Sequence, residues 1–317
     1  MDYAISLDDV RAAAKRIEGK AHRTPVATCS KLDAMAGRQL FFKCENLQKV
    51  GAFKFRGACN AVMQLSEVDA ANGVVTHSSG NHAQALALAA RMREIDAHIV
   101  MPENSSPVKF RAVEGYGARI IRCESKLIAR ETTADQVIVE TGGKLIHAYD
   151  HPDIMAGQGT VSLELLEQTT KLDALVIPVG GGGLLSGNCI AAKAINPSIR
   201  IFAAEPAGAD DCAQSMASGQ LVPQTSPNTI ADGLLTSLGE LTWPIIRDHV
   251  ERVIVADDDA VIAAMRLAWE RAKLLIEPSS AVAVAAALSD EFKSVEGIER
   301  VGVVLSGGNV NLDALPW

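Results

Sequence analysis

The sequence predicts an α/β fold built on parallel sheets. Strand-like runs rich in Val, Ile and Leu alternate with Ala-rich helical runs along almost the whole chain of 317 residues. Many of the strand-like runs are continuously apolar, as expected of parallel strands that helices cover on both faces. Three of them lead into turns of small residues, which is typical of the carboxyl edge of such a sheet. We therefore expect an α/β architecture with parallel strands.

The first element is an amphipathic helix that begins after Ser6. Ser6 and Asp9 have the spacing of a capping box, and Gly19 follows the last turn. The apolar face is expected from Val10, Ala14 and Ile17. The strand-like runs that follow are, in order, Leu40–Lys43, Gly73–His77, Ala97–Met101, Arg119–Cys123, Leu145–Ala148, Ala174–Pro178, Ile199–Ala204, Arg252–Val255 and Val301–Leu305.

The chain contains no Pro-, Gly- or Ser-rich linker and no sequence repeat of fixed period. Any second domain must therefore be an insertion within the first. The strand, helix and strand series from about Val74 to Ala148 is long enough to form a small sheet of its own. We expect a large domain of residues 1–70 and 150–317 and a small domain of residues 71–149.

Charge and cysteine usage restrict the class of protein. Lys and Arg number 30 against 38 Asp and Glu, a net charge of -8 without a basic block, which argues against a nucleic-acid partner. The six cysteines form no C-x-x-C pair, so we expect a reducing, cytoplasmic location without disulfides or a zinc site. The N-terminal stretch does not resemble a signal, and the longest apolar runs, such as Ala281–Leu288, are too short to span a membrane.

Three glycine-containing turns follow apolar strands and precede helices or the end of the chain. They are residues 78–82 (SSGNH), residues 180–183 (GGGG) and residues 306–309 (SGGN). A strand, a tight turn and a helix start together present free backbone N–H groups and the positive end of the helix dipole, which suits an anion. A single turn of this kind is equally explained by a tight connection. Four consecutive glycines favour close approach of the backbone to a ligand.

The tetraglycine does not match the common nucleotide motifs. Counting from Gly181, the dinucleotide fingerprint requires a third glycine where the chain has Ser186. Glu205, about 22 residues beyond the second glycine, imitates the ribose-binding acid, so a nucleotide-dependent oxidoreductase stays an alternative. Asn188 stands where a P-loop requires lysine. A smaller phosphate is the remaining candidate.

Lys54 lies between Phe53 and Phe55. Apolar surroundings disfavour the charged form of a lysine and lower its pKa, which makes it available as a nucleophilic amine or a base. The alternative is a structural lysine whose stem packs while its ammonium reaches water.

Together these motifs resemble the fold-type II pyridoxal-phosphate enzymes of the serine/threonine dehydratase family. The resemblance covers nearly the whole chain, and it is greatest to the members that racemise serine. It implies a large parallel-sheet domain, a smaller inserted α/β domain and an active site in the cleft between them. The segments that carry it are Lys43–Gln48, Phe53–Ala58, the three turns, Ala156–Thr160, Ala204–Pro206, Thr229–Gly233, Trp243–Asp248 and Lys273–Pro278.

The resemblance implies roles toward pyridoxal 5'-phosphate. Lys54 would form the Schiff base, and Phe53 would lie against the cofactor ring. Asn81 would bond the phenolic oxygen, and Ser306 would face the pyridine nitrogen. A hydroxyl there cannot keep this nitrogen protonated, which makes the ring a weaker electron sink and favours loss of a β-substituent. The phosphate would be held by the backbone amides of Gly180, Gly181, Gly182, Gly183 and Leu184.

The resemblance also implies a substrate and a reaction. The carboxylate of a small amino acid would be received by Ser78, Ser79, Asn81 and His82. Lys54 would act as the base at Cα, and Ser79 as the proton donor on the opposite face, so that L-serine and D-serine interconvert. Elimination of water from serine or threonine would give a keto acid, pyruvate in the case of serine, and ammonia. An alternative role of Ser79 is to bond the turn backbone.

In addition to the nucleotide-dependent oxidoreductase, two other functions stay open as alternatives. Residues 150–153 look more like dehydratases, and hydroxyaspartate dehydratases share Ser79, so the chain could be a threonine or L-threo-3-hydroxyaspartate dehydratase without significant racemisation. The other alternative is a non-catalytic amino-acid sensor on the same fold.

Two further sites are considered, a cation site in an acidic loop and an ATP effector site formed by dispersed residues. From spacing alone Glu205, Asp210 and Asp211 are expected to form a solvated acidic loop. The resemblance implies instead Mg²⁺, Ca²⁺ or Mn²⁺ held by Glu205, the Ala209 carbonyl and Asp211. It also implies a homodimer and an ATP effector site. Val50 and residues 29–31 depart from the ATP-binding pattern, which is matched by Lys49, Gln84, Tyr116, Lys273 and Asn309.

Overall fold

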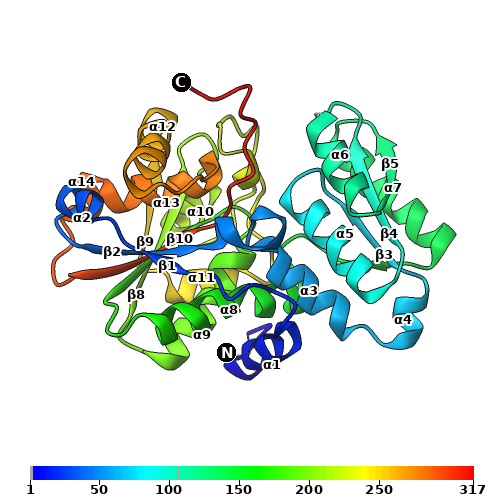
Figure 1. Ribbon diagram of the computed structural model, residues 1–317, viewed down its shortest axis with the longest axis horizontal. Coiled ribbons are helices and arrows are strands. Elements are labelled where there is room, and N and C mark those ends of the chain that lie inside the picture. The colour runs from blue at the N-terminus through cyan, green and yellow to red at the C-terminus, as the bar shows by residue number, and fades with distance from the viewer. Residues whose placement is uncertain (1–2, 106) are drawn as a thin grey trace.

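The computed structural model describes residues 3–105 and 107–317, which form two sheets with helices on both faces (Figure 1). Residues 1 and 2, which were assigned to the large domain from sequence, lie outside the described part. The larger body contains both described ends of the chain and the smaller one contains β3 to β5. The predicted α/β class with parallel sheets is confirmed.

The large sheet has six strands in the order β1-β2-β10-β7-β8-β9. Neighbours are parallel except β1 and β2, which are antiparallel. In the centre of the sheet Val303 pairs with Phe42 on one side and Val176 on the other. The strands are β1 (Val26–Ala27), β2 (Gln39–Cys44), β7 (Ala174–Pro178), β8 (Arg200–Pro206), β9 (Arg252–Ala256) and β10 (Arg300–Leu305).

The small sheet has four parallel strands in the order β5-β4-β3-β6. They are β3 (Val74–His77), β4 (Ala97–Pro102), β5 (Arg119–Cys123) and β6 (Lys144–Leu145). Each predicted strand-like run overlaps a strand, but Leu145–Ala148 shares only Leu145 with β6, so the prediction of a strand through Ala148 is wrong. After Leu145 the chain leaves the sheet, and residues 147–150 turn toward the large domain. The two-residue β1 was not predicted.

Helices cover both faces of the large sheet. One face carries α2 (Ser30–Ala36), α12 (Asp258–Leu267), α13 (Pro278–Leu288) and α14 (Asp290–Lys293), whose apolar side chains form one core with the sheet. The other face carries α1 (Leu7–Ile17), α8 (Pro152–Gln168), α9 (Gly183–Ile195) and α11 (Trp243–His249). A further helix, α10 (Asp211–Ser218), follows β8.

The small sheet is covered in the same way. On one face lie α3 (Lys54–Gln64), α5 (Asn81–Arg93) and α6 (Pro107–Gly115), and on the other lies α7 (Leu127–Thr141). The short α4 (Glu67–Ala71) leads into β3. Because α3 packs on both α5 and α8, it belongs to the contact between the two bodies. The domain limits at residues 70 and 150 stay a prediction.

The first helix, α1, begins as its sequence predicts. The Ser6 hydroxyl accepts a hydrogen bond from Asp9 N at 3.3 Å, and the Asp9 carboxylate accepts one from Ser6 N at 2.8 Å. The buried face consists of Val10, Ala13 and Ile17. The assignment of Ala14 to this face is wrong: Ala14 is partly exposed, because the register of the helix turns Ala13 inward.

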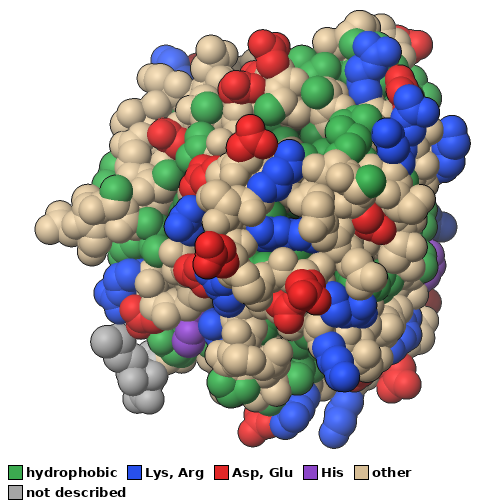
Figure 2. Space-filling view, turned by 90° about the vertical axis from the view of Figure 1, so that its left-hand side faces the viewer, with side chains coloured by type: hydrophobic (Ala, Val, Ile, Leu, Met, Phe, Trp, Pro, Cys, Tyr) green, Lys and Arg blue, Asp and Glu red, His purple; other side chains and the backbone are tan. Residues whose placement is uncertain are grey.

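The surface shows mixed charge. Figure 2 shows Lys and Arg side chains interspersed with Asp and Glu side chains over one face of the molecule. Among the described residues, no helix has both the length and the apolar character that a membrane crossing requires.

Candidate active site

The three glycine-containing turns are brought together from both sheets. Residues 78–82 connect β3 of the small sheet to α5, whereas the tetraglycine and residues 306–309 follow the neighbouring strands β7 and β10 of the large sheet. The Asn309 side chain donates to the Asn81 side chain at 2.8 Å, which joins the first turn to the third. The site is therefore assembled from both bodies of the chain.

Lys54 is fixed to the third turn through the backbone. Phe53 N donates to Ser306 O at 3.0 Å, and Gly308 N donates to Gly51 O at 2.9 Å. An isolated antiparallel bridge joins Ala52 to Gly307. The start of α3 is thus held at the carboxyl end of β10.

The Lys54 ammonium lies in a largely desolvated place. Its Nζ donates to Ala148 O at 2.8 Å and lies 5.2 Å from the centroid of the Phe53 ring. Burial lowers the pKa of Lys54 to about 8, although the nearby Glu277 carboxyl acts to raise it. The predicted lowering of the pKa is confirmed, and Lys54 has a substantial neutral fraction near pH 8.

Glu277, to which sequence reasoning gave no role, organises the polar side of the site. Its Oε1 accepts from Asn81 Nδ2 at 2.9 Å and its Oε2 from Asn309 N at 3.1 Å. Burial, followed by the Asp232 charge, raises the pKa of Glu277 to about 8. An acid directly before Pro278, at the start of an apolar helix, was the one available signal.

The tetraglycine packs against the protein itself. A Cβ on Gly181 would lie below 3.0 Å from the ring of Tyr149, and one on Gly183 would lie 2.8 Å from Tyr149 O. Gly182 has a φ of +87°, and a Cβ there would lie 2.6 Å from Thr242 Oγ1. These contacts require glycine without any ligand. The inference from four glycines to a close ligand was therefore incomplete, because Tyr149 supplies a second reason.

The backbone amides of the tetraglycine nevertheless fit an anion. Residues 180–184 are buried at the N-terminus of α9. Outside α9 their N–H groups donate no hydrogen bond to a described residue. Free amides at a helix start match the phosphate that the sequence predicts.

The first turn differs from the expectation at His82. The His82 ring is buried, and Nε2 contacts Ile146 O at 3.0 Å, so Nε2 carries the proton and donates. Nδ1 is buried without a partner, and burial, followed by the Lys54 charge, lowers the pKa of His82 to about 3. The ring has no N–H left for a carboxylate. A contribution of His82 to anion binding would come from its backbone amide at the start of α5.

The three serines of the site, Ser78, Ser79 and Ser306, differ in their hydrogen bonds and burial. Ser78 Oγ accepts from Gly80 N at 3.4 Å and so stabilises the turn. Within the described chain the Ser79 hydroxyl makes no hydrogen bond, so the alternative in which Ser79 bonds the turn backbone is not seen. The Ser306 residue is buried, and its backbone oxygen receives Phe53 N.

The His147 ring packs edge to face against two other rings beside Lys54, and the sequence did not predict these contacts. The His147 ring lies 4.6 Å from the Tyr149 ring and 6.2 Å from the His77 ring, between centroids. Burial lowers the pKa of His147 to about 4 and also lowers that of His77. Asp150 accepts hydrogen bonds from the backbone N–H groups of residues 240 and 241. Residues 147–150 therefore contact Lys54, the tetraglycine and the loop before α11.

The predicted cation ligands are buried, so the solvated-loop alternative is wrong for Glu205 and Asp211. The Glu205 carboxylate accepts from Cys212 N and Ala213 N at 2.9 and 2.8 Å. Asp211 Oδ2 accepts from Leu238 N at 2.9 Å, while its Oδ1 is buried without a partner. Burial raises the pKa of Glu205 to about 8 and that of Asp211 to about 6.

Two buried carboxylates and the carbonyl of buried Ala209 are a donor set that suits a hard cation. In the described residues no group of three or more His, Cys, Asp or Glu side chains could hold a metal ion. The predicted set contains two such side chains only, so that observation does not bear on it.

The residues that match an ATP site are not joined to one another. No hydrogen bond or ion pair links Lys49, Gln84, Tyr116 and Lys273 within the described part of the chain, and Asn309 belongs to the Glu277 network.

A cavity of about 180 Å³ lies elsewhere, between α7 and strands β4 and β5. It is bounded by His98, Arg119 and Gln136, among others. None of the predicted site residues borders it.

Comparison with known proteins agrees with this geometry. The family model described as pyridoxal-phosphate dependent enzyme matches residues 17–307. A serine racemase of Dictyostelium discoideum is 52% identical over 98% of this chain and 97% of that protein. A beta-hydroxyaspartate dehydratase of Paracoccus denitrificans (strain Pd 1222) is 45% identical over 99% of both. The solved structure of maize serine racemase superimposes with a TM-score of 0.97 and 52% identity, over 98% of this chain and 95% of that one. The chain therefore belongs to the fold-type II pyridoxal-phosphate dependent enzymes.

Proposed function

We propose that the chain is a serine racemase that also eliminates water from serine or threonine. The observation that carries the proposal is the Lys54 amine, held among three turns and with a pKa lowered to about 8. The relatives at 52% identity support it, because both are named serine racemases. When bound, pyridoxal phosphate withdraws electrons from the substrate Cα and so makes its proton acidic.

Lys54 would bond the cofactor covalently when no substrate is present and would then take the Cα proton. The Ala148 carbonyl, 2.8 Å from Nζ, fixes the direction of the side chain. Phe53, whose ring lies 5.2 Å from Nζ, would cover one face of the cofactor ring. Asn81 can donate to the cofactor oxygen only through its second amide hydrogen, because the first is bonded to Glu277.

Ser79 would return the proton on the face opposite Lys54. A donor there must be free to orient its hydroxyl, and the Ser79 hydroxyl has no partner among the described residues. Ser78, by contrast, is occupied by the Gly80 amide. Racemisation requires both faces, whereas elimination requires the lysine face and a departing hydroxyl.

A second candidate is a dehydratase of 3-hydroxyaspartate that does not racemise significantly. The relative named beta-hydroxyaspartate dehydratase is 45% identical over 99% of this chain, which favours keeping it. Residues 150–153, which directly follow Tyr149 in the chain, are the segment that would separate the two substrate classes.

We further propose that Glu205, the Ala209 carbonyl and Asp211 bind a divalent cation, Mg²⁺, Ca²⁺ or Mn²⁺. The unpartnered, buried Asp211 Oδ1 supports this, because a buried anionic oxygen without a partner is costly. The cation would stabilise the connection between β8 and α10 rather than take part in the reaction.

Three further expectations stay predictions. They are an ATP effector site, a homodimer and a cytoplasmic location. The six cysteines are free, and all except Cys29 are buried.

A set of parallel incubations tests the proposed function. The purified protein with added pyridoxal phosphate would be given L-serine, D-serine, L-threonine or L-threo-3-hydroxyaspartate in separate reactions. We expect keto acid from the hydroxy amino acids and interconversion of the serine enantiomers. Keto acid from hydroxyaspartate without D-serine from L-serine would favour the second candidate, and no product from any of them would favour a sensor.

A further inference from the structure

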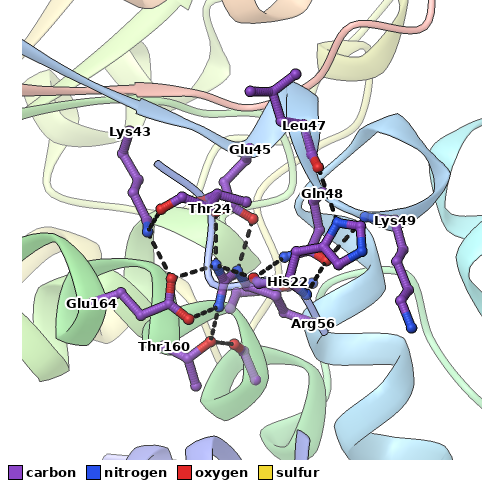
Figure 3. Close-up of polar contacts among 12 residues, drawn as sticks. His22, Thr24, Lys43, Glu45, Leu47, Gln48, Lys49, Arg56, Thr160 and Glu164 are labelled. Atoms are coloured by element: carbon purple, nitrogen blue, oxygen red, sulfur yellow. Dashed lines mark hydrogen bonds and ion pairs between the residues drawn. The ribbon is translucent and has the colours of Figure 1, made fainter. Parts of the chain in front are cut away.

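A cluster of four charged side chains joins the first turn of α3 to β2 and α8 (Figure 3). It contains Lys43 from β2, Glu45 after β2, Arg56 from α3 and Glu164 from α8. The side chains of Lys43, Glu45 and Arg56 are 0% exposed, and that of Glu164 is 16% exposed. None of the four has a role in the proposed reaction.

Arg56 is the centre of the cluster. Its Nε and Nη2 donate to Glu45 at 2.7 and 2.8 Å, and its Nη1 and Nη2 donate to Glu164 at 2.7 and 2.8 Å. Further bonds reach Thr160 Oγ1 at 3.1 Å and His22 O at 3.3 Å. The planar guanidinium therefore bridges two carboxylates from different elements, an arrangement that a lysine cannot reproduce.

The charges of the cluster balance. Lys43 Nζ donates to Glu164 at 2.6 Å and to Thr24 O at 2.8 Å. Burial acts to raise the pKa of Glu164, but the hydrogen bonds and charges of Arg56 and Lys43 outweigh it, so that the pKa is lowered. Burial lowers the pKa of Lys43, and Glu164 opposes that change. Two cations face two anions.

Stability alone does not explain such a cluster. Removing four charges from water costs several kcal/mol per ion, and well-packed apolar side chains of similar volume are often as stabilising. The position of Arg56 in the chain suggests another role. Arg56 comes two residues after Lys54, which places the two side chains about 200° apart around α3. Lys54 therefore points to the three turns while Arg56 points to Glu45 and Glu164.

The connection between Glu45 and Lys54 is strained. Val50 has a φ of 56° and a ψ of 13°, a left-handed conformation that is unfavourable for a β-branched residue. Gly51 follows with a φ of 69°. Such a backbone persists only where the surrounding structure holds it in place. Glu45 on one side of this connection and Arg56 on the other are joined by two hydrogen bonds.

The neighbouring polar contacts hold the same connection. Gln48 Nε2 donates to His22 O at 2.8 Å, and Gln48 Oε1 accepts from His22 N at 2.8 Å (Figure 3). On the α8 side, Gly57 N donates to Gln158 Oε1 at 3.1 Å. A Cβ on Gly157 would lie 2.6 Å from Gly57 Cα, so α3 and α8 are in close backbone contact.

We propose that Arg56 is a positioning residue for Lys54. Through Glu45 it holds the strained connection before α3, and through Glu164 it holds the first turn of α3 on α8. Together these contacts fix where the Lys54 amine lies relative to the bound cofactor. The inference rests on the proposed role of Lys54.

The test removes one cation and one anion together. In the double variant Glu45→Leu/Arg56→Met the Lys43–Glu164 pair stays, so no buried charge is left without a partner. A neutral replacement of this kind is expected to keep most of the stability. The matched control is Arg23→Met/Glu167→Leu, which removes an exposed ion pair of 2.9 Å. A second control, Val261→Ala, opens a cavity in the core of the large domain away from Lys54.

The measurements are the melting temperature, the visible circular dichroism of the bound cofactor and kcat for L-serine. The circular dichroism reports how the chain holds the cofactor and does not depend on turnover. We expect the double variant to bind the cofactor and to melt no lower than Val261→Ala, but with less than half of the wild-type visible dichroism per bound cofactor. Both controls should keep the wild-type dichroism. We expect kcat to fall about tenfold or more, since small displacements of a reacting group are costly.

Wild-type dichroism and kcat in a folded double variant would overturn the proposal and leave the cluster a structural one. Where the double variant does not fold, Arg56→Lys decides, because it keeps the charge and loses the bridge. The same losses in Arg56→Lys support the proposal, and wild-type values overturn it. A wild-type protein without any cofactor band would instead refute the proposed role of Lys54.

Discussion

The substitution Gly181→Ala separates two reasons for the tetraglycine. A methyl group on Gly181 would lie below 3.0 Å from three atoms of the Tyr149 ring. The ring cannot easily move away, because His147 lies 4.6 Å from it and the Tyr149 backbone packs on Gly183. Gly181 does not have a positive φ, so alanine there meets no left-handed backbone penalty. Overpacking of this kind costs about 1 to 3 kcal/mol.

The assay is thermal unfolding of the cofactor-free protein. For a chain of this size we expect Gly181→Ala to lower the melting temperature by about 2 to 6 °C, taking about 2 °C per kcal/mol. A double-mutant cycle compares the cost of Gly181→Ala in the wild type with its cost in Tyr149→Ala. The cost in the Tyr149→Ala background should be about 1 to 3 kcal/mol smaller, because the colliding ring is absent. Gly115→Ala is the matched control, since nothing lies within 4 Å of a Cβ there and its φ is not positive.

The reasoning is refuted if Gly181→Ala leaves the cofactor-free protein as stable as the wild type and weakens only cofactor binding. Additive effects of the two substitutions would also contradict it. Either result would mean that the ligand, and not the Tyr149 ring, is the reason for glycine at position 181.

The remaining predictions concern single groups of the site. Lys54→Ala should abolish the visible band of the covalently bound cofactor and nearly all turnover, because the Lys54 amine is the group that would bond the cofactor and take the Cα proton; an absorption spectrum and a keto-acid assay check this. Glu277 has a pKa of about 8 in the folded protein against 4.5 as its ordinary value. The folded state therefore holds an extra proton between these values, and its stability falls with rising pH. This contribution of Glu277, up to about 4 kcal/mol between pH 4.5 and 8 in the cofactor-free protein, should be absent in Glu277→Gln, whereas the contributions of Glu205 and Asp211 should remain. Urea unfolding across pH measures the difference, and the same pH dependence in both proteins would contradict the assignment. Removal of divalent cations with EDTA should lower the melting temperature of the wild type and leave Asp211→Asn unchanged, since a cation bound only by the folded protein stabilises it; equal responses of the two proteins, or no metal by elemental analysis, would contradict the cation site.

Local sequence features predicted the elements that local physics determines. Apolar runs such as Val301–Leu305 form central parallel strands because both faces are covered, and Ser6 with Asp9 starts α1 because a capping box satisfies free amides. The prediction was wrong at Ala14, one position from the buried Ala13, because spacing alone leaves the exact face of a helix open. Likewise, β6 ends at Leu145 because the chain turns there to meet the large domain.

Contacts between distant residues could not be predicted in this way. Asn81 and Glu277 are 196 residues apart, and only the folded chain shows that they share a hydrogen bond. The Tyr149 ring against Gly181 explains a glycine that the sequence attributed to a ligand. The burial of Glu205 and Asp211 depends on the packing around β8 and α10, so their spacing suggested a solvated loop.

The measurement that tests the central claim most directly compares the wild type with Ser79→Ala on L-serine and D-serine. Chiral chromatography would follow the enantiomers while a parallel assay follows pyruvate. We predict that the wild type forms both D-serine and pyruvate from L-serine. Ser79→Ala should lose racemisation and D-serine elimination, while L-serine elimination survives within about tenfold, about 1.4 kcal/mol of barrier. Continued racemisation by the variant, or equal loss of both activities, would contradict the assignment of Lys54 and Ser79 to opposite faces of the substrate.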